Sequence, residues 1–537
     1  MNPSNDRALR AADLHIPESF NAAAYFVDRN VEEGRGAKVA IECGETRVTY
    51  DQVLASVNRL GNALRNVLRV RMEERVLLLL LDTPEFAYSF FGAIKIGAVP
   101  VPANTLLKPP DYRHLLNDSR ARVAIVSEAL LPQILALPRS DLPFLLEVMV
   151  VGGAAEGTRS FADLVRDQSP LLDQAPTGRD DAAFWLYSSG STGLPKGCVH
   201  LHHDMVVCAE LYARGVLQIS EADRCFSVAK LFFAYGLGNG LYFPFAFGAT
   251  SILWPGPPRP QDVFATIEVH RPTLFFSVPT NYAMLLAHPR EAEPDFDLRS
   301  VRLAVSAGEA LPAPLYERFA QRFGVEILDG IGSTEVLHIF ISNRPGAVRP
   351  GSSGQIVPGY EARLVDDDGR LAEAGAIGSL LIKGDSICSA YWNQHEKTKE
   401  IIVGSWIRTG DEYAQDEDGY FWYAGRSDDM LKVGGIAVSP VEIENTLMAH
   451  PAVQEAGVVG CADRDGLIKP LAYVTLRVGV LGTPDLAAEL QAFVRSQIAE
   501  YKRPRWVEFV SELPKTATGK TQRFKLRQRA GGDTRDA

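Results

Sequence analysis

The sequence predicts an α/β protein with a large first domain of helix-covered β-sheets and a small α+β C-terminal domain. At 537 residues the chain is too long for one compact core, so two or more domains are expected. Over roughly the first 330 residues, short apolar runs alternate with amphipathic helical patterns, which is typical of βαβ units. After about Gly351 the pattern changes to strands that turn at Asp-Gly pairs.

Two strand–helix pairs illustrate the first pattern. The run RVLLLLLD, residues 75–82, is too short to span a bilayer and is typical of a buried parallel strand. It is followed by an amphipathic stretch, residues 83–98, that we expect to form a helix. The run TLFFSVP, residues 273–279, and the following residues 280–289 repeat the same order. These pairs predict parallel sheets covered by helices.

The second pattern predicts two hairpins, over residues 360–384 and 412–426, that we expect to form a β-barrel-like subdomain. Beyond Arg426 the chain resumes as a small α+β unit. We therefore expect a large domain over residues 1–427 and a small domain over residues 428–537.

Composition excludes several classes of protein. A net charge of −11 argues against a nucleic-acid partner, because phosphate backbones require a basic face. The six cysteines are scattered without a CxxC pair, as expected for a reducing compartment. Residues 1–20 lack the apolar region of a signal peptide, and no apolar run is long enough for a membrane span. We expect a cytoplasmic protein with no membrane partner.

The stretch LYSSGSTGLPKG, residues 186–197, can bury almost no apolar surface, and ordering its glycines is costly in conformational entropy. Loops of this kind persist where backbone N–H groups and hydroxyls surround a phosphate. It is not a Walker A loop, because Lys196 precedes Gly197 instead of following it. GLGNG at residues 236–240 lacks the spacing of a dinucleotide-binding fingerprint, and no serine lies in a nucleophile elbow. HLHHD, residues 200–204, lies on one expected helix, where packing is a better interpretation than zinc binding.

Five motifs in order resemble the adenylate-forming superfamily of acyl-CoA and aryl-CoA synthetases, luciferases and adenylation domains. They are YSSGSTGLPKG from Tyr187, GIGSTE from Gly330, SWIRTGDEY from Ser405, GRSDDMLKVGG from Gly425 and PKTATGKTQR from Pro514. The resemblance covers essentially the whole chain. It implies an α/β fold with a mobile C-terminal domain, a reaction that uses ATP and Mg²⁺, and coenzyme A as co-substrate.

The chemistry of these residues agrees with carboxylate activation, in which two anions must be brought together on ATP. Thr334 can contact the α-phosphate, and Glu335 offers a hard oxygen ligand to Mg²⁺. The resemblance assigns Lys520 to the transition state, Asp428 to the hinge, and Gly434 and Gly435 to a tunnel for coenzyme A. The expected ATP- and AMP-binding residues are Ser188, Ser189, Gly190, Ser191, Thr192, Gly193, Lys196, Ser306, Ala307, Gly308, Glu309, Asp329, Gly330, Ile331, Gly332, Ser333, Asp411 and Arg426.

The stretch KLFFAYGLGNG, residues 230–240, occupies the place of the family's acid pocket. Amino-acid-activating relatives have an Asp there, whereas this chain has Phe233 and Ala234, so an ammonium group would be uncompensated. The motifs resemble the benzoate-CoA ligase group most, and glycines 308, 330 and 332 are expected to leave room for a ring. The expected aryl-acid pocket consists of Phe233, Ala234, Tyr235, Gly236, Gly330, Ile331 and His338.

We therefore expect an aryl-CoA ligase that acts on benzoate or a small substituted benzoate such as aminobenzoate or hydroxybenzoate. One alternative is an aryl-AMP ligase that loads a separate carrier protein, since no carrier module is fused to the chain. A more distant alternative is a non-catalytic adenylate-binding protein, although Lys520 and Glu335 argue against it. An NAD-dependent dehydrogenase fits poorly, because GLGNG at residues 236–240 lacks the glycine spacing of a dinucleotide-binding fingerprint. The sequence permits either a monomer or a homodimer.

Overall fold

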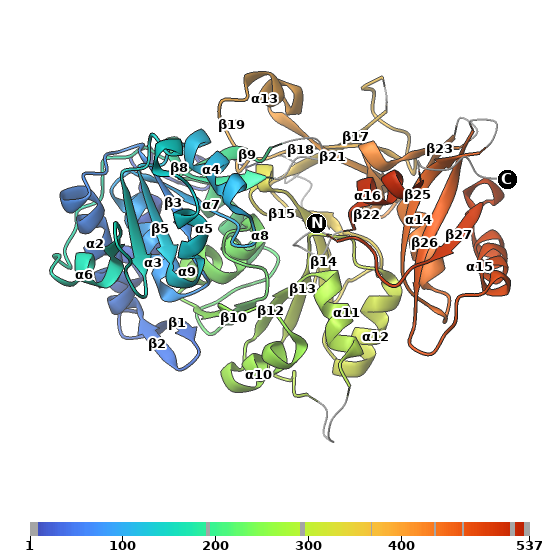
Figure 1. The fold of residues 1–537 in the computed structure, drawn as a ribbon, viewed down its shortest axis with the longest axis horizontal. Helices are drawn as coiled ribbons and strands as arrows, with labels where there is room; N and C mark the ends of the chain where they lie inside the picture. Colours follow the sequence, from blue (N-terminus) through green and yellow to red (C-terminus); the bar gives the residue numbers. More distant parts are fainter. Residues whose placement is uncertain are drawn as a thin grey trace.

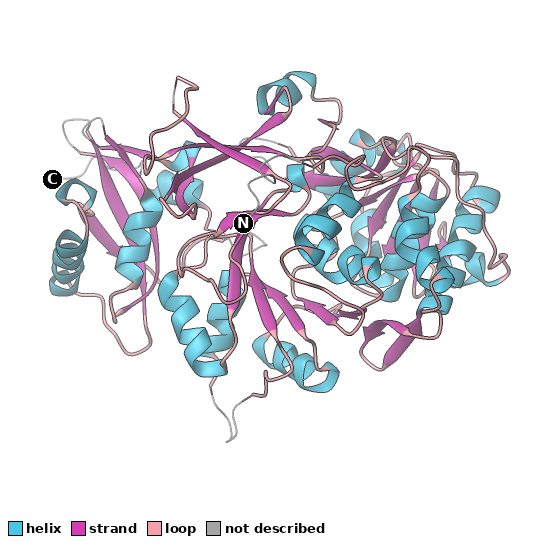
Figure 2. Ribbon diagram, turned by 180° about the vertical axis from the view of Figure 1, so that it is seen from behind, coloured by secondary structure: helices cyan, strands magenta, loops and turns pink. Residues whose placement is uncertain are grey.

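The computed structural model describes residues 9–188, 194–289, 296–366, 368–433, 436–463, 467–515 and 521–530. Figure 1 shows an elongated molecule with the N-terminal sheets, in blue and green, at one end and a C-terminal unit, in red, at the other. Antiparallel strands lie between these parts along the top of the view. The reverse view in Figure 2 shows helices packed along the sheets at both ends.

One sheet is entirely parallel, in the order β4-β3-β5-β6-β7. Its strands are β3 (Arg75–Leu79), β4 (Val99–Pro102), β5 (Val123–Ser127), β6 (Glu147–Val151) and β7 (Arg159–Ser160). The apolar run in β3 is fully buried, which confirms the strand predicted from that run. Helix α3 (Pro84–Lys95) follows, with Pro84 in its first turn, where proline is favoured. The other helices of this part are α1 (Arg29–Glu32), α2 (Tyr50–Asn62), α4 (Pro109–Asp118), α5 (Leu131–Leu135) and α6 (Phe161–Arg166).

A nine-stranded sheet runs in the order β16-β15-β14-β13-β12-β10-β11-β1-β2. Its strands are β1 (Val39–Cys43), β2 (Thr46–Thr49), β10 (Arg224–Ser227), β11 (Thr250–Leu253), β12 (Leu274–Ser277), β13 (Leu303–Ser306), β14 (Ile327–Gly332), β15 (Ile339–Ser342) and β16 (Gln355–Ile356). Strands β10 to β14 are parallel, whereas β15 and β16 add to the edge in antiparallel pairing. The carboxyl ends of β12, β13 and β14 therefore lie side by side, where open α/β sheets bind ligands.

Helices accompany this second sheet. They are α7 (Asp204–Cys208), α8 (Ala234–Leu237), α9 (Phe243–Ala246), α10 (Pro260–His270), α11 (Pro279–Ala287) and α12 (Ala313–Phe323). Helix α11 follows β12 directly, so the second predicted strand–helix pair is also confirmed.

The predicted hairpins are confirmed as parts of a five-stranded antiparallel sheet, ordered β17-β18-β21-β20 with β22 paired to β21. Its strands are β17 (Glu361–Val365), β18 (Gly378–Lys383), β20 (Ile402–Val403), β21 (Trp406–Gln415) and β22 (Phe421–Arg426). A smaller antiparallel sheet joins β8 (Ala182–Ser188), β9 (Lys196–Leu201) and β19 (Ala390–Tyr391). Helix α13 (His395–Ile401) follows β19.

The C-terminal unit has its own hydrophobic core. It contains β23 (Leu431–Val433), β24 (Ile436–Val438), α14 (Pro440–Met448), β25 (Val453–Ala462), β26 (Ile468–Leu476), α15 (Pro484–Gln497), β27 (Trp506–Phe509) and α16 (Arg523–Ala530). Ile443, Val458 and Leu490 are fully buried within one cluster of this core. Every apolar member of that cluster lies beyond residue 430, and the boundary between residues 427 and 428 stays a prediction.

Two further expectations concern membrane spans and cysteines. Within the described residues, no helix combines the length and the apolar character needed to cross a bilayer. All six cysteines are free thiols, and all of them except the half-buried Cys43 are buried.

Candidate active site

The β8–β9 hairpin frames the predicted phosphate loop. Ser188 ends β8 and Lys196 begins β9, and the two residues are paired partners. The loop residues between them, Ser189, Gly190, Ser191, Thr192 and Gly193, lie outside the described residues. The Lys196 Nζ lies 4.6 Å from the centroid of the Tyr391 ring. A lysine ammonium therefore stands at the end of the loop, on an aromatic support.

Thr334 and Glu335 lie in a 3₁₀ turn, η7 (Thr334–Val336), directly after β14. The Tyr391 hydroxyl donates a 2.6 Å hydrogen bond to Glu335 Oε1. Burial and the nearby Glu335 charge raise the pKa of Tyr391, so its hydroxyl stays protonated and continues to donate. Tyr391 thus contacts both Lys196 and Glu335. Sequence patterns gave no signal for Tyr391, since the contact joins segments more than 50 residues apart.

Three groups from two other segments hold the backbone of this turn. His200 Nε2 donates to the Thr334 carbonyl at 2.8 Å, and the Cys388 N–H donates to the Glu335 carbonyl at 2.7 Å. Ser386 Oγ donates to the carbonyl of the third turn residue, Val336, at 2.8 Å. The next residue, Leu337, has φ +72°, in a region that non-glycine residues rarely adopt. The turn is therefore strained and held from outside.

His200 does not lie on a helix, so the expectation for HLHHD was wrong. It lies in β9, whereas α7 begins only at Asp204. Strand β9 continues through Leu201 before the chain turns into α7. His200, His202 and His203 are all buried.

The segments expected around adenine lie on neighbouring strands. Ser306 at the end of β13 is the register partner of Asp329 in β14. The Leu311 N–H, just beyond the predicted segment of Ala307, Gly308 and Glu309, donates to Asp329 Oδ2 at 3.2 Å. The β13–α12 connection and β14 thus converge at the carboxyl edge of the sheet.

Glycine is favoured at positions 308, 330 and 332 for different structural reasons. A Cβ on Gly330 would lie 2.8 Å from the Ile341 carbonyl oxygen, and one on Gly332 would lie 2.5 Å from that of His338. These two glycines permit close pairing with β15, and the expectation that they also leave room for a ring stays a prediction. A Cβ on Gly308 would meet Val278 only at 3.8 Å, although its φ of +95° favours glycine.

Asp411 and Arg426 form the pair expected at the ribose. They are register partners on β21 and β22, and Arg426 Nη1 lies 3.0 Å from Asp411 Oδ1. The same nitrogen donates to the Thr409 carbonyl at 3.0 Å. Arg426 therefore fixes the position of the Asp411 carboxylate.

The expected aryl pocket is built at the start of α8. The Tyr235 ring lies 5.7 Å from that of His338, which follows the Thr334–Val336 turn. The Tyr235 hydroxyl contacts the carbonyls of Ser277 and Val305, at 3.2 and 3.1 Å, near the ends of β12 and β13. Its hydrogen is thus committed to the backbone, which leaves the ring as its contribution to a pocket.

The other pocket residues surround these rings. Ala234 and Gly236 are buried, whereas Phe233 and Ile331 are half-buried. A Cβ on Gly236 would lie 2.1 Å from the Lys230 carbonyl oxygen, so only glycine fits there.

His338 is buried among aromatic rings, with the Phe243 ring 4.4 Å away. Its Nε2 lies 3.2 Å from Asn239 Oδ1, a contact that sequence reasoning did not identify. Burial lowers the pKa of His338 to about 3, so its imidazole is neutral at physiological pH. This wall of the pocket is therefore uncharged and aromatic.

Comparisons with known proteins agree with this geometry. The family model described as AMP-binding enzyme matches residues 27–392, and the model described as AMP-binding enzyme C-terminal domain matches residues 442–520. The chain belongs to the AMP-binding enzyme family. This confirms the superfamily inferred from the five motifs.

Relatives of the AMP-binding enzyme family cover nearly the full chain. The benzoate–CoA ligase of Thauera aromatica is 52% identical over 96% of this chain and 97% of its own. The 4-hydroxybenzoate–CoA/benzoate–CoA ligase of Rhodopseudomonas palustris is 46% identical over 95% of this chain and 94% of its own. An anthranilate CoA ligase solved with anthranoyl-AMP has a TM-score of 0.92 at 48% identity, covering 97% of this chain and 99% of its own.

The C-terminal part of this AMP-binding enzyme follows β22 through a 3₁₀ segment, η8 (Ser427–Asp429), that contains the backbone of the expected hinge residue Asp428. Gly434, Gly435 and Lys520, to which the resemblance assigns the tunnel and catalysis, lie outside the described residues. The Lys515 and Thr521 backbones form a β-bridge on either side of the segment with Lys520.

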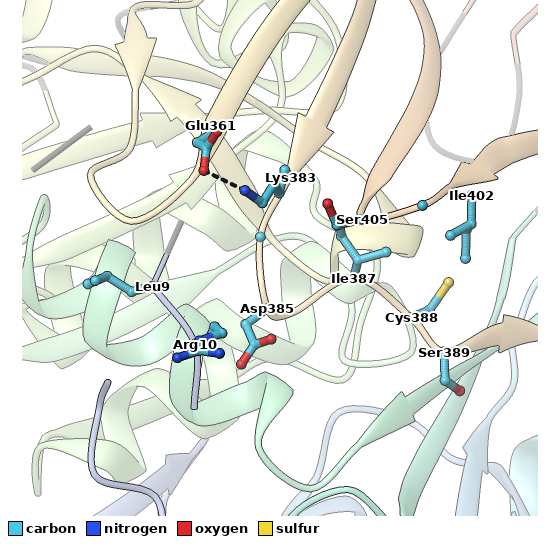
Figure 3. A pocket seen from close by; sticks show the side chains of 12 residues that line it. Leu9, Arg10, Glu361, Lys383, Asp385, Ile387, Cys388, Ser389, Ile402 and Ser405 are labelled. Atoms are coloured by element: carbon cyan, nitrogen blue, oxygen red, sulfur yellow. Dashed lines mark hydrogen bonds and ion pairs between the residues drawn. The ribbon is translucent and has the colours of Figure 1, made fainter. Parts of the chain in front are cut away.

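A cavity of about 480 Å³ has none of the predicted site residues in its lining (Figure 3). Lys383 and Glu361 form an ion pair at 2.8 Å on its wall. The N-terminal segment, with Leu9 and Arg10, forms another part of the lining. Cys388, whose N–H donates to the Glu335 carbonyl, also lines the cavity, so the cavity lies next to the segment that holds the Thr334–Val336 turn.

The buried carboxyl of Asp329 makes the free energy of unfolding depend on pH. Burial raises its pKa to about 8, so the folded protein retains a proton that the unfolded chain loses near pH 3.8. Between these values the folded state binds more protons, so the free energy of unfolding falls as pH rises, by at most about 1.4 kcal/mol per pH unit.

The variant Asp329→Asn does not titrate but keeps an acceptor for the Leu311 N–H. We expect its melting temperature, relative to the wild type, to be higher at pH 8 than at pH 5. Thermal denaturation of both proteins across this range measures the difference. Parallel curves would show that the Asp329 carboxyl is ionised throughout.

Proposed function

We propose that the chain is an ATP-dependent aryl-CoA ligase for benzoate or a small substituted benzoate such as aminobenzoate or hydroxybenzoate. The acid attacks the α-phosphate of ATP to give aryl-AMP and pyrophosphate, and the thiol of coenzyme A then displaces AMP. The observation that supports this best is the neutral aromatic wall of Tyr235 and His338 beside the Thr334–Val336 turn. The rings of Tyr235 and His338 suit the apolar ring of the acid, and the adjacent Thr334–Val336 turn suits its reacting carboxylate.

At the phosphate end, Lys196 and the residues of the preceding loop surround the β- and γ-phosphates. Thr334 contacts the α-phosphate, and the half-buried Glu335 offers a carboxylate to Mg²⁺. Among the described residues, no three His, Cys, Asp or Glu side chains form a metal cluster. A single carboxylate fits Mg²⁺, which is usually held by one or two carboxylates together with substrate phosphates. Bound there, the ion neutralises phosphate charge as bonds change at the α-phosphate.

At the nucleoside end, Asp411 accepts hydrogen bonds from the ribose hydroxyls while Arg426 holds it in place. The segments at Ser306 and Asp329 border the adenine. The ring of the acid lies against Tyr235, Ile331 and His338. The relatives named for benzoate, hydroxybenzoate and anthranilate support a ring acid with at most a small substituent.

For the transfer step we propose that residues 428–537 rotate about Asp428 relative to residues 1–427. One orientation brings Lys520 to the carboxylate and the α-phosphate. The other brings Gly434 and Gly435 beside the pantetheine arm of coenzyme A, where a side chain would obstruct it. The separate core of the C-terminal unit supports rotation as a rigid body.

The test is mass spectrometry of products from ATP, Mg²⁺, coenzyme A and a panel of benzoates, cinnamates and short fatty acids. An aryl-CoA mass from a ring acid supports the proposal and identifies the substrate. Aryl-AMP without aryl-CoA would move the function to carrier-protein loading. The absence of both products with every acid would contradict the proposed pocket.

The six cysteines form no disulfide with one another, which supports a reducing location such as the cytoplasm.

The aryl pocket has its own prediction. Tyr235→Ala removes a ring that contacts His338, so kcat/KM for benzoate should fall roughly 10- to 100-fold, as expected for losing one buried aromatic contact. A short aliphatic acid should be affected much less, because it does not reach the ring. Tyr235→Phe is the matched control, since it keeps the ring and removes only the hydroxyl. Equal losses for aromatic and aliphatic acids would contradict the placement of the pocket.

A further inference from the structure

His200 connects two parts of the proposed nucleotide site. It lies on β9, the strand that begins with Lys196 after the predicted phosphate loop. Its Nε2 reaches the carbonyl of Thr334, in the turn that also contains Glu335. A single buried side chain thus links the strand that leaves the phosphate loop to the turn proposed to contact the α-phosphate and Mg²⁺.

The hydrogen bonds of His200 fix its orientation. Nε2 lies 2.8 Å from the Thr334 carbonyl oxygen, which only accepts, so this nitrogen donates. Nδ1 lies 2.8 Å from Asp204 Oδ2, and that oxygen also accepts the Leu201 N–H at 3.1 Å. Asp204 therefore holds the ring at Nδ1, and Nε2 points at the Thr334 carbonyl.

The surroundings hold this pair in one orientation. His200 and Asp204 are fully buried, and the Phe184 ring stacks on the imidazole at 5.2 Å with an interplanar angle of 18°. Neither ring nitrogen is exposed to solvent, so the Nε2 donor stays in one position against the Thr334 carbonyl.

The turn needs such a donor because it is strained. Leu337 has φ +72°, which costs about 1–3 kcal/mol and persists only where the surroundings enforce it. The carbonyls of Glu335 and Val336 are held by Cys388 and Ser386. Of the three donors described for this turn, only His200 comes from the strand after the phosphate loop.

We propose that His200, oriented by Asp204, is a positioning residue for aryl-AMP formation. It fixes the Thr334–Val336 turn so that the Thr334 hydroxyl and the Glu335 carboxylate are aligned when the acid attacks the α-phosphate. The inference rests on the proposed function, because it assigns His200 to the first half-reaction of that ligase. The second half-reaction depends less on His200, since pyrophosphate has then left and the α-phosphate no longer undergoes substitution.

The test compares two substitutions at His200 by half-reaction. His200→Phe keeps the stack on Phe184 and removes the Nε2 donor, so ATP–pyrophosphate exchange at saturating ATP should fall roughly 10- to 100-fold, about the cost of losing one buried hydrogen bond. Transfer from supplied aryl-AMP to coenzyme A should change less than about threefold, well under the effect of such a bond. His200→Gln retains an N–H donor for Thr334 and should recover most of the exchange rate.

His202→Phe is the matched control. His202 is also buried, but its Nδ1 accepts the Ala22 N–H at 3.0 Å, a contact that involves none of the proposed site residues. This variant should lower the melting temperature without changing the ratio of the two half-reactions. Asp204→Asn, which weakens the orientation of His200, should shift the ratio in the same direction as His200→Phe.

Two outcomes would overturn the inference. One is equal loss of both half-reactions in His200→Phe, and the other is an unchanged exchange rate. A wild-type protein that forms no aryl-CoA or aryl-AMP would instead contradict the proposed function itself, so the two failures are distinguishable.

Discussion

Replacing Lys520 with alanine is expected to slow aryl-AMP formation about a thousandfold and to spare transfer from supplied aryl-AMP to coenzyme A. The ammonium of Lys520 is proposed to bridge the carboxylate and the α-phosphate, where negative charge develops as they approach. Removing a charged contact that is realised mainly in the transition state lowers kcat more than it raises KM. ATP–pyrophosphate exchange measures the first half-reaction, and single-turnover thioester formation measures the second.

Lys515→Ala is the matched control for Lys520→Ala. Lys515 lies five positions earlier, and its Nζ forms a 2.7 Å ion pair with Glu455. Removing this largely structural charge should leave the ratio of the half-reactions unchanged. Equal loss of both half-reactions in Lys520→Ala would contradict the rotation of residues 428–537 between two orientations.

The second large effect is expected at Asp411. Asp411→Ala should lower kcat/KM for ATP by roughly 100-fold, because two hydrogen bonds from the ribose diol to a carboxylate are lost. Most of the change should appear in KM for ATP, since the ribose is bound equally before and during the reaction. Steady-state kinetics at varied ATP and saturating acid measure it.

Two variants calibrate the Asp411 result. Asp411→Asn keeps one acceptor oxygen and should lie between the wild type and alanine. Asp418→Ala removes an acid in the β21–β22 turn that pairs with Arg349 at 2.6 Å, and it should leave KM for ATP unchanged. An Asp411→Ala enzyme with unchanged KM would place the ribose elsewhere.

Much of the fold follows from local sequence patterns. The apolar run of β3 and the Asp-Gly turns between β17 and β18 and between β21 and β22 were predicted correctly, because strand and turn propensities act over a few residues. The five motifs likewise identified the family, because each retains its order and spacing along the chain.

The support of the site could not be predicted in this way. Tyr391, Ser386 and Cys388 contact the Thr334–Val336 turn across sequence separations that no periodicity encodes. His200 was expected on a helix, whereas the β8–β9 pairing, which no local pattern encodes, extends the strand through it. The close approach of β15 to Gly330 and Gly332 is likewise visible only in the folded sheet.

The separate core of the C-terminal unit has a consequence for calorimetry. Because Ile443, Val458 and Leu490 belong to a hydrophobic cluster made of residues beyond 430, we expect the heat absorbed on melting to divide between two cooperative blocks. Each block should have its own enthalpy and heat-capacity increment, so a scan should contain two overlapping endotherms. If adenine nucleotides bind mainly to the larger block, as proposed, they should move its endotherm more than the other. The difference in temperature between the two peaks therefore measures how strongly a bound nucleotide couples the unfolding of the two blocks.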